Sequence, residues 1–133
     1  MIPRYLGDWI VERSILDESS GDIILCAGHA TLERNDDRLR YDEAVSFRLR
    51  DRLVQATRTY FYRFAAGVIA ATFADGRTFF VTSLQPDGTA RATHRCGPDV
   101  YAGTLTLRER DWETRWDATG TKALSIRTRY TRG

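Results

Sequence analysis

The residues best suited to acid–base chemistry stand close together in the sequence, at His94, Asp99 and Tyr101. Gly97-Pro98 lies between them and predicts a sharp turn that brings Asp99 and Tyr101 back toward His94. A histidine with a carboxylate partner can act as a general base near neutral pH, and Tyr101 would then donate the proton. The structural alternative is that Asp99 caps the backbone amides of the turn while His94 hydrogen-bonds across strands.

A second candidate is Glu43, which lies beside Tyr41 on the apolar side of an alternating segment. A buried carboxylate must be paired or take up a proton, and Arg58, which shares the parity of Tyr60, is its expected mate. This pair would fix the strand register, or it would anchor a ligand carboxylate or hydroxyl through Arg58 while Glu43 orients it. Glu43 and His94 could instead be the acid–base groups of an isomerase, cyclase or dehydratase that needs no cofactor.

Aromatic residues are spread over several of the alternating segments, and only Trp9 and Phe47 are assigned to a packed core. Tyrosine hydroxyls and indole N–H groups need hydrogen-bond partners, which a cavity supplies more readily than a dry core. The pattern therefore predicts a pocket for a small, mostly apolar molecule, aromatic or lipid-like. The residues predicted to bind it are Tyr41, Glu43, Arg58, Tyr60, Tyr62, Phe73, His94, Tyr101, Trp112, Trp116 and Tyr130.

Composition disfavours metal, nucleic-acid and membrane binding. Cys26 and Cys96 are the only cysteines and form no Cys-x-x-Cys pair, so we expect free thiols, with Cys96 as a small buried filler. Twenty basic and eighteen acidic residues are mixed along the chain and leave a formal charge of only +2. The expected partner is a small molecule, and no metal, cofactor, nucleic acid or membrane is expected.

The segments that must position these residues alternate apolar and polar positions, as half-buried strands do. Turn residues such as Asp75-Gly76 separate them, and Arg50–Gln55 is expected to form a short helical turn or a bulge. The predicted strands are Trp9–Ile15, Ile23–Leu32, Leu39–Arg48, Thr57–Phe64, Val68–Phe73, Thr78–Ser83, Ala90–Cys96, Gly103–Glu109, Trp112–Ala118 and Lys122–Arg132.

These elements predict an all-β protein whose single domain, residues 1–133, is an up-and-down antiparallel β-barrel of about ten strands with an internal cavity. Closure removes the sheet edges, which a sandwich would leave exposed. No apolar run approaches the ~20 residues that cross a bilayer. The N-terminus lacks a signal-peptide pattern, so a cytoplasmic location is expected. Phe61 or Phe80, expected on the outer face, could seed a dimer, so the protein is expected to be a monomer or a homodimer.

Two motifs at the ends of the chain carry a family resemblance. Gly7-x-Trp9 resembles the start of the first strand in lipocalins and their calycin relatives. The run ending at Arg132 resembles the terminal calycin strand. The resemblance implies that Trp9 closes one end of the barrel and that an arginine of the last strand, Arg132 or Arg129, packs across it.

More specifically, the chain resembles a family of lipocalin-like bacterial and fungal domains of unknown function, above all in His94-x-Cys96-Gly97-Pro98-Asp99-x-Tyr101. That resemblance implies a fold and no activity. Binding of a small apolar molecule inside the barrel is therefore the leading hypothesis, and the cofactor-free enzyme is the alternative. A haem site with His94 or His29 as axial ligand is a third hypothesis, although neither histidine lies near the C-terminal strands, and His29 is expected to face solvent.

Overall fold

The computed structural model describes residues 2–132 and consists almost entirely of antiparallel strands. A short 3-10 helix, Ile2–Tyr5, precedes the first strand. The ten strands are β1 (Gly7–Asp17), β2 (Ile23–Asn35), β3 (Arg38–Leu49), β4 (Arg52–Ala65), β5 (Val68–Phe73), β6 (Thr78–Ser83), β7 (Thr89–Cys96), β8 (Asp99–Leu107), β9 (Trp112–Thr119) and β10 (Leu124–Thr131).

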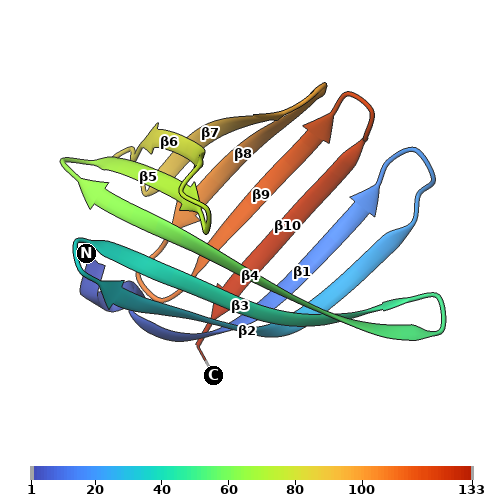
Figure 1. Cartoon of the computed structure of the whole chain (residues 1–133), viewed down its shortest axis with the longest axis horizontal. Helices are drawn as coiled ribbons and strands as arrows, with labels where there is room; N and C mark the ends of the chain where they lie inside the picture. Colours follow the sequence, from blue (N-terminus) through green and yellow to red (C-terminus); the bar gives the residue numbers. More distant parts are fainter. Residues whose placement is uncertain (1, 133) are drawn as a thin grey trace.

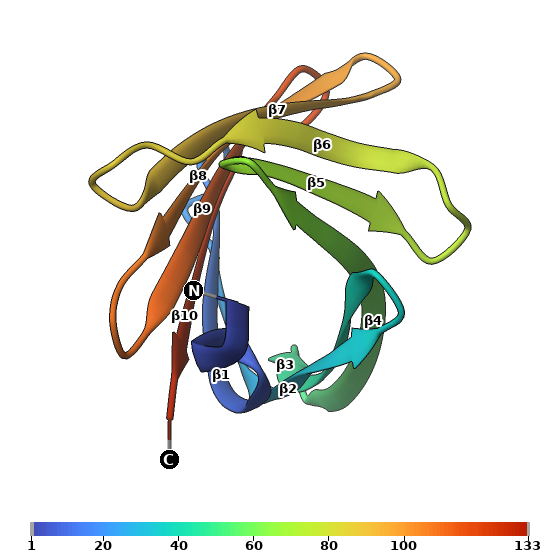
Figure 2. The same ribbon diagram turned by 90° about the vertical axis from the view of Figure 1, so that its left-hand side faces the viewer.

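The strands follow one another around a nearly closed barrel, as predicted. Every strand except β6 and β7 pairs with both of its neighbours in the chain, and β1 pairs with β10, which joins the two ends of the meander. In Figure 1, β3 and β4 cross in front of β1, β9 and β10, so the sheet curves round on itself. Figure 2 shows that interior from the side, with β6 and β7 lying over it.

Side chains, and not main-chain hydrogen bonds, join β6 to β7, and we call this place the seam of the barrel. Within residues 2–132, these are the only consecutive strands without a backbone ladder. The Thr82 hydroxyl donates to the carbonyl oxygen of Arg91 across the seam. Nδ1 of His94 lies 2.9 Å from the carbonyl oxygen of Phe79 and donates to it. Side chains therefore close the barrel where main-chain hydrogen bonds do not.

The predicted strands are confirmed, with one correction at the tip of the β3–β4 hairpin. Arg50 and Asp51 form a tight turn, with Arg50 at a φ of 58°, and β4 begins directly at Arg52. The expectation of a helical turn or a bulge over 50–55 is therefore wrong. Leu49 pairs with Arg52 across the turn and continues the β3–β4 register, so the residues after the turn belong to the strand.

One end of the barrel is closed by the N-terminal residues, as the calycin resemblance implied. Trp9 is buried and its indole donates to the carbonyl oxygen of Tyr5 at 2.9 Å. The Arg132 guanidinium lies 3.6 Å from the centre of the Trp9 ring and donates to the carbonyl oxygens of Arg4, Leu6 and Asp8. Arg132, and not Arg129, is the arginine that packs across the tryptophan.

A bulge in the β5–β6 pairing changes which aromatic side chains face inward. The register shifts between Ala71 and Thr72, and both Phe79 and Phe80 contact interior aromatic rings. Phe80 is only 3% exposed, so the expectation that it faces outward and seeds a dimer is wrong. Phe61 does lie on the outer face, where the Arg38 guanidinium covers its ring at 4.2 Å.

Gly28 is an inward-facing position where β2 and β3 approach too closely for a side chain. A Cβ there would lie 2.0 Å from the carbonyl oxygen of Ala44 and 2.7 Å from the Cα of Val45. We predict that Gly28→Ala lowers the free energy of unfolding by about 1–3 kcal/mol, because backbone atoms must move to admit the methyl group. Urea denaturation measures the change. The matched control is Ala27→Ser on the outer face of the same strand, with an expected change within about 0.5 kcal/mol.

Candidate functional site

A buried polar network lies in the middle of the barrel and begins with an ion pair. Arg13 of β1 donates from both terminal guanidinium nitrogens to the two carboxylate oxygens of Glu43 of β3, at 2.8 and 2.5 Å. The side chains of Arg13 and Glu43 are only 9% and 1% exposed. This is the planar, two-bond geometry that makes guanidinium–carboxylate pairs strong.

Hydroxyl groups complete the network. The Tyr41 hydroxyl donates to the Glu43 carboxylate at 2.6 Å and lies 2.8 Å from the hydroxyl of Tyr130. Nε of Arg13 donates to the Thr128 hydroxyl at 2.8 Å. We call these five residues, from β1, β3 and β10, the Arg13–Glu43 network. Because the polar atoms satisfy one another, the network can be buried without an unpaired charge.

The expected Glu43–Arg58 ion pair is therefore wrong, and Arg13 takes the place of Arg58. Arg58 stands opposite Glu43 in the β3–β4 register, but its guanidinium extends toward the Tyr60 hydroxyl at 3.3 Å. The sequence contained a signal for Arg13, because that residue shares the parity of Trp9 and Val11 on β1. Parity identifies an inward arginine, but it does not say which strand lies across the barrel from it.

The network sets the protonation of its members. Burial alone would raise the pKa of Glu43, but the hydrogen bonds and charge of Arg13, with the Tyr41 hydroxyl, outweigh burial and hold that pKa below its usual value. Burial raises the pKa of Tyr130 to about 12, and it raises the pKa of Tyr41 as well. Glu43 is a carboxylate and both tyrosines are neutral at physiological pH.

Above the network lies a pocket of about 410 Å³, which we call the interior pocket. Three members of the network, Arg13, Thr128 and Tyr130, form part of its wall. Eight of the predicted ligand-binding residues line it, namely Arg58, Tyr60, Tyr62, Phe73, His94, Tyr101, Trp116 and Tyr130. Other lining residues not predicted from the sequence include Arg13, Phe79, Lys122, Leu124 and Ile126.

Stacked rings form one wall of the interior pocket. The ring of Phe79 lies between those of Phe73 and Trp116, with centroids 4.9 and 5.1 Å away and planes inclined by 23° in both cases. Trp116 lies directly over Gly103 of the next strand, where a Cβ would come within 2.5 Å of the indole ring. Glycine at that position makes room for the tryptophan. Phe79 was not among the predicted ligand-binding residues, and at the β5–β6 bulge both Phe79 and Phe80 reach interior rings.

The remaining predicted aromatic residues belong to the core beneath the pocket. Tyr41 is 1% exposed, and Trp112 is 6% exposed and stacks on Tyr130 at 3.6 Å with an angle of 3°. Neither residue lines the interior pocket, and neither does Glu43. The indole nitrogen of Trp112 is the only buried side-chain polar atom without a hydrogen-bond partner in residues 2–132. Trp9 and Phe47, expected in the core, pack there.

The predicted acid–base cluster is not assembled. Asp99 accepts from the backbone amide and the hydroxyl of Thr121, at 2.6 and 2.8 Å, and these bonds lower its pKa. His94 is bound to the carbonyl oxygen of Phe79, and its ring centre lies 6.3 Å from that of Tyr101. The structural alternative is confirmed for His94, which hydrogen-bonds across strands. It is corrected for Asp99, which caps the turn between β9 and β10 and not the Gly97-Pro98 turn.

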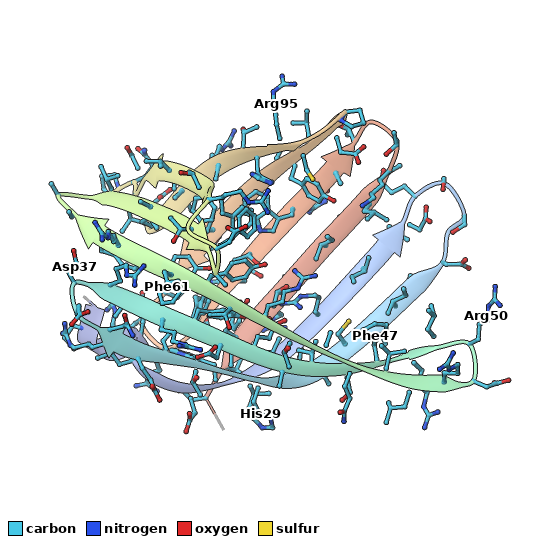
Figure 3. All side chains as sticks on the ribbon, in the orientation of Figure 1. His29, Asp37, Phe47, Arg50, Phe61 and Arg95 are labelled. Carbon is cyan, nitrogen blue, oxygen red and sulfur yellow. The ribbon has the colours of Figure 1, made fainter. Side chains whose placement is uncertain are left out.

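The exposure of Cys96 differs from the expectation, whereas that of His29 agrees with it. Cys96 is exposed at the rim of the interior pocket, so its assignment as a buried filler is wrong. Cys26 is buried, and burial raises the pKa of its thiol. His29 points away from the barrel, as predicted (Figure 3). A haem inside the barrel would therefore find no ligand in His29.

Two further features concern metals and membranes. Among residues 2–132, no three histidine, cysteine or acidic side chains gather in a way that could hold a metal ion. The same part of the chain contains no helix of the length and apolarity that a membrane crossing requires.

The geometry defines a class of protein: an up-and-down β-barrel of ten strands, nearly closed, with an aromatic pocket above a buried ion pair. The chain belongs to a family of unknown function, DUF6314, whose pattern covers residues 5–132. The expectation of a family without known activity is confirmed. No curated protein matches the chain.

Two solved structures share this fold. The S-type phycobiliprotein lyase CPES from Guillardia theta superposes with a TM-score of 0.71 at 7% identity, over 98% of this chain and 89% of the lyase. A protein of unknown function from the DUF3598 family of Nostoc punctiforme has a TM-score of 0.67 at 13% identity, over 100% of this chain and 49% of that protein. At these identities the likeness shows the fold, and it is consistent with a calycin-like barrel.

We predict that Glu43→Gln lowers the free energy of unfolding by about 3–5 kcal/mol at pH 7, because Arg13 is left as an uncompensated buried charge. Urea denaturation measures the loss. The double variant Arg13→Met/Glu43→Leu removes both charges and should be more stable than the single variant. A loss below about 1 kcal/mol in Glu43→Gln would contradict the importance of the pair.

The same pair predicts a pH dependence. The pKa of Glu43 is lower in the folded protein than its ordinary value of 4.5, so the ion pair contributes its full stability above that pH. The contribution is lost as the pH falls below 4.5 toward the folded pKa. The stability difference between the wild type and Glu43→Gln should therefore shrink below pH 4.5, measured in parallel urea series. A difference that stays constant down to about pH 3 would refute this account.

Proposed function

We propose that this protein binds a small, planar, mostly apolar molecule in the interior pocket. The observation that carries the proposal is a space of about 410 Å³ inside the barrel, walled by stacked aromatic rings. Small-molecule sites in proteins are concave, largely apolar and about this size, with a few polar groups that fix orientation. The volume suits an aromatic compound of two to four fused or linked rings.

The shape of the wall favours a planar ligand. The near-parallel rings of Phe73, Phe79 and Trp116 form a continuous stack, and a flat molecule could extend it. The imidazole of His94 stands edge-on to Phe79, with centroids 5.2 Å apart, and so lies roughly perpendicular to the stacked rings. Its Nδ1 donates to the Phe79 carbonyl, which fixes the ring orientation.

The Arg13–Glu43 network lies at the bottom of the interior pocket, and its polar groups already hydrogen-bond to one another. Glu43 makes three hydrogen bonds, two from Arg13 and one from Tyr41, and is not itself a wall residue. A carboxylate engaged in this way is poorly suited to abstract a proton from a ligand. The contacts of Glu43 therefore favour a binding protein over the cofactor-free enzyme.

The structural likeness supports the use of such a barrel around a small molecule, since one protein of the same fold is a phycobiliprotein lyase. In keeping with the barrel, we infer a single binding site per chain. Soluble expression as a monomer or homodimer in the cytoplasm remains a prediction from the sequence alone.

The test uses N-phenyl-1-naphthylamine, an uncharged planar dye whose fluorescence rises in apolar surroundings. We predict saturable binding to the wild type and a loss of at least tenfold in affinity in Leu124→Trp, because the indole would fill the interior pocket. The matched control is Ser125→Trp, on the same strand with the opposite parity, which should bind as the wild type does. Absence of binding to the wild type, or equal affinity in all three proteins, would refute the proposal. Native mass spectrometry of the purified protein would reveal a co-purifying molecule.

A further inference from the structure

The charged residues of the interior pocket are not balanced in sign. Arg13, Arg58 and Lys122 line the pocket together with His94, and no aspartate or glutamate is among the lining residues. Arg13 is neutralised by the Glu43 carboxylate directly below. Arg58 stands opposite Glu43 in the β3–β4 register, but its guanidinium extends to the Tyr60 hydroxyl and forms no ion pair with that carboxylate. One guanidinium charge is therefore left over at the pocket.

Arg58 is the carrier of that extra charge. It lies on the inward parity of β4, with Ala56, Tyr60 and Tyr62. Within residues 2–132 it forms no ion pair, and its guanidinium donates only to the Tyr60 hydroxyl, at 3.3 Å. On the outer face, by contrast, Arg40 is paired with Asp42 at 2.8 Å.

The other charged groups near the pocket have oppositely charged or polar neighbours. The charge of Lys122 helps to lower the pKa of the Asp99 carboxyl. Asp75, which shares a surface hollow with Arg58, is bound to Arg77 at 2.7 Å. His94 is bound through Nδ1 to the Phe79 carbonyl. An anion entering the pocket would therefore find Arg58 as the guanidinium whose donors are least occupied.

From this arrangement we propose that the ligand of the interior pocket carries an acidic group, a carboxylate or a similar oxyanion, which Arg58 binds while the aromatic wall holds the rest of the molecule. This inference rests on the proposed function and specifies the chemical class of the ligand. A guanidinium presents parallel N–H donors that match an oxyanion. Arg58 is exposed at the pocket mouth, so it remains hydrated until the ligand arrives, and the acidic end of the ligand lies toward solvent.

The test compares two dyes that share the same rings and differ by one sulfonate group. N-phenyl-1-naphthylamine is neutral, and 8-anilino-1-naphthalenesulfonate carries the same rings with a sulfonate. We predict that the wild type binds the sulfonate about tenfold more tightly, the effect of one charge-assisted hydrogen-bonded contact at a half-exposed site. Arg58→Gln should abolish that preference and leave the affinity for the neutral dye within about twofold. Raising the salt concentration should weaken only the sulfonate complex.

Two further variants make the result specific to Arg58. Arg58→Lys keeps the charge and should retain a reduced preference for the sulfonate, since an ammonium lacks the paired donors. Arg95→Gln removes the same charge from the outer face of β7, where Arg95 points away from the barrel (Figure 3), and should change nothing. Unfolding transitions of all variants establish that the fold persists.

The outcomes separate this inference from the proposed function. If neither dye binds the wild type, both proposals fall. If the neutral dye binds in the interior pocket but the sulfonate shows no advantage, the ligand class is wrong and the pocket stands. The role of Arg58 would also be overturned if Arg58→Gln lowered the affinity for both dyes equally. It would likewise be overturned if Arg95→Gln had the same effect as Arg58→Gln.

Discussion

The barrel depends on an ion pair placed where apolar side chains would normally meet. Arg13 and Glu43 come from strands separated by β2, so their pairing fixes how β1 and β3 face each other across the curved sheet. Removing two charges from water is costly, and only two parallel hydrogen bonds together with the hydroxyls of Tyr41 and Thr128 make that burial tolerable. A pair of this kind adds little net stability over well-packed apolar residues, but it penalises every register that separates its members.

The network also divides the interior into two regions with different roles. Below it, Tyr5, Trp9 and Trp112 pack with little exposure and close the end of the barrel near the chain termini. Above it, most of the aromatic side chains are partly buried and surround the interior pocket. A barrel of about this strand number has an interior just large enough for side chains or for one small ligand. In this barrel, packed side chains fill one end and the interior pocket occupies the other.

Residue alternation carried most of the information that the sequence offered about this fold. Period-two patterns located the strands, assigned Glu43 and Arg58 to the interior and placed Trp116 where it lines the pocket. Three expectations failed, each for its own physical reason. The Arg50-Asp51 turn lacks the Asn-Gly chemistry that marks tight hairpins. The bulge at Ala71/Thr72 lets both Phe79 and Phe80 reach the interior, so Phe80 does not face outward. The partner of Glu43 depends on curvature across strands, which local alternation does not encode.

The seam between β6 and β7 gives the barrel a preferred place to widen. Elsewhere, separating two strands would break a row of main-chain hydrogen bonds, whereas here the bonds of Thr82 and His94 are the ones to be given up. His94 and Phe79 belong both to this seam and to the aromatic wall of the interior pocket. A ligand that enters between β6 and β7 would therefore contact these two side chains first and weaken the hydrogen bond that joins the strands. Entry and closure would then be governed by the same few side chains, with the other nine strand pairings left undisturbed.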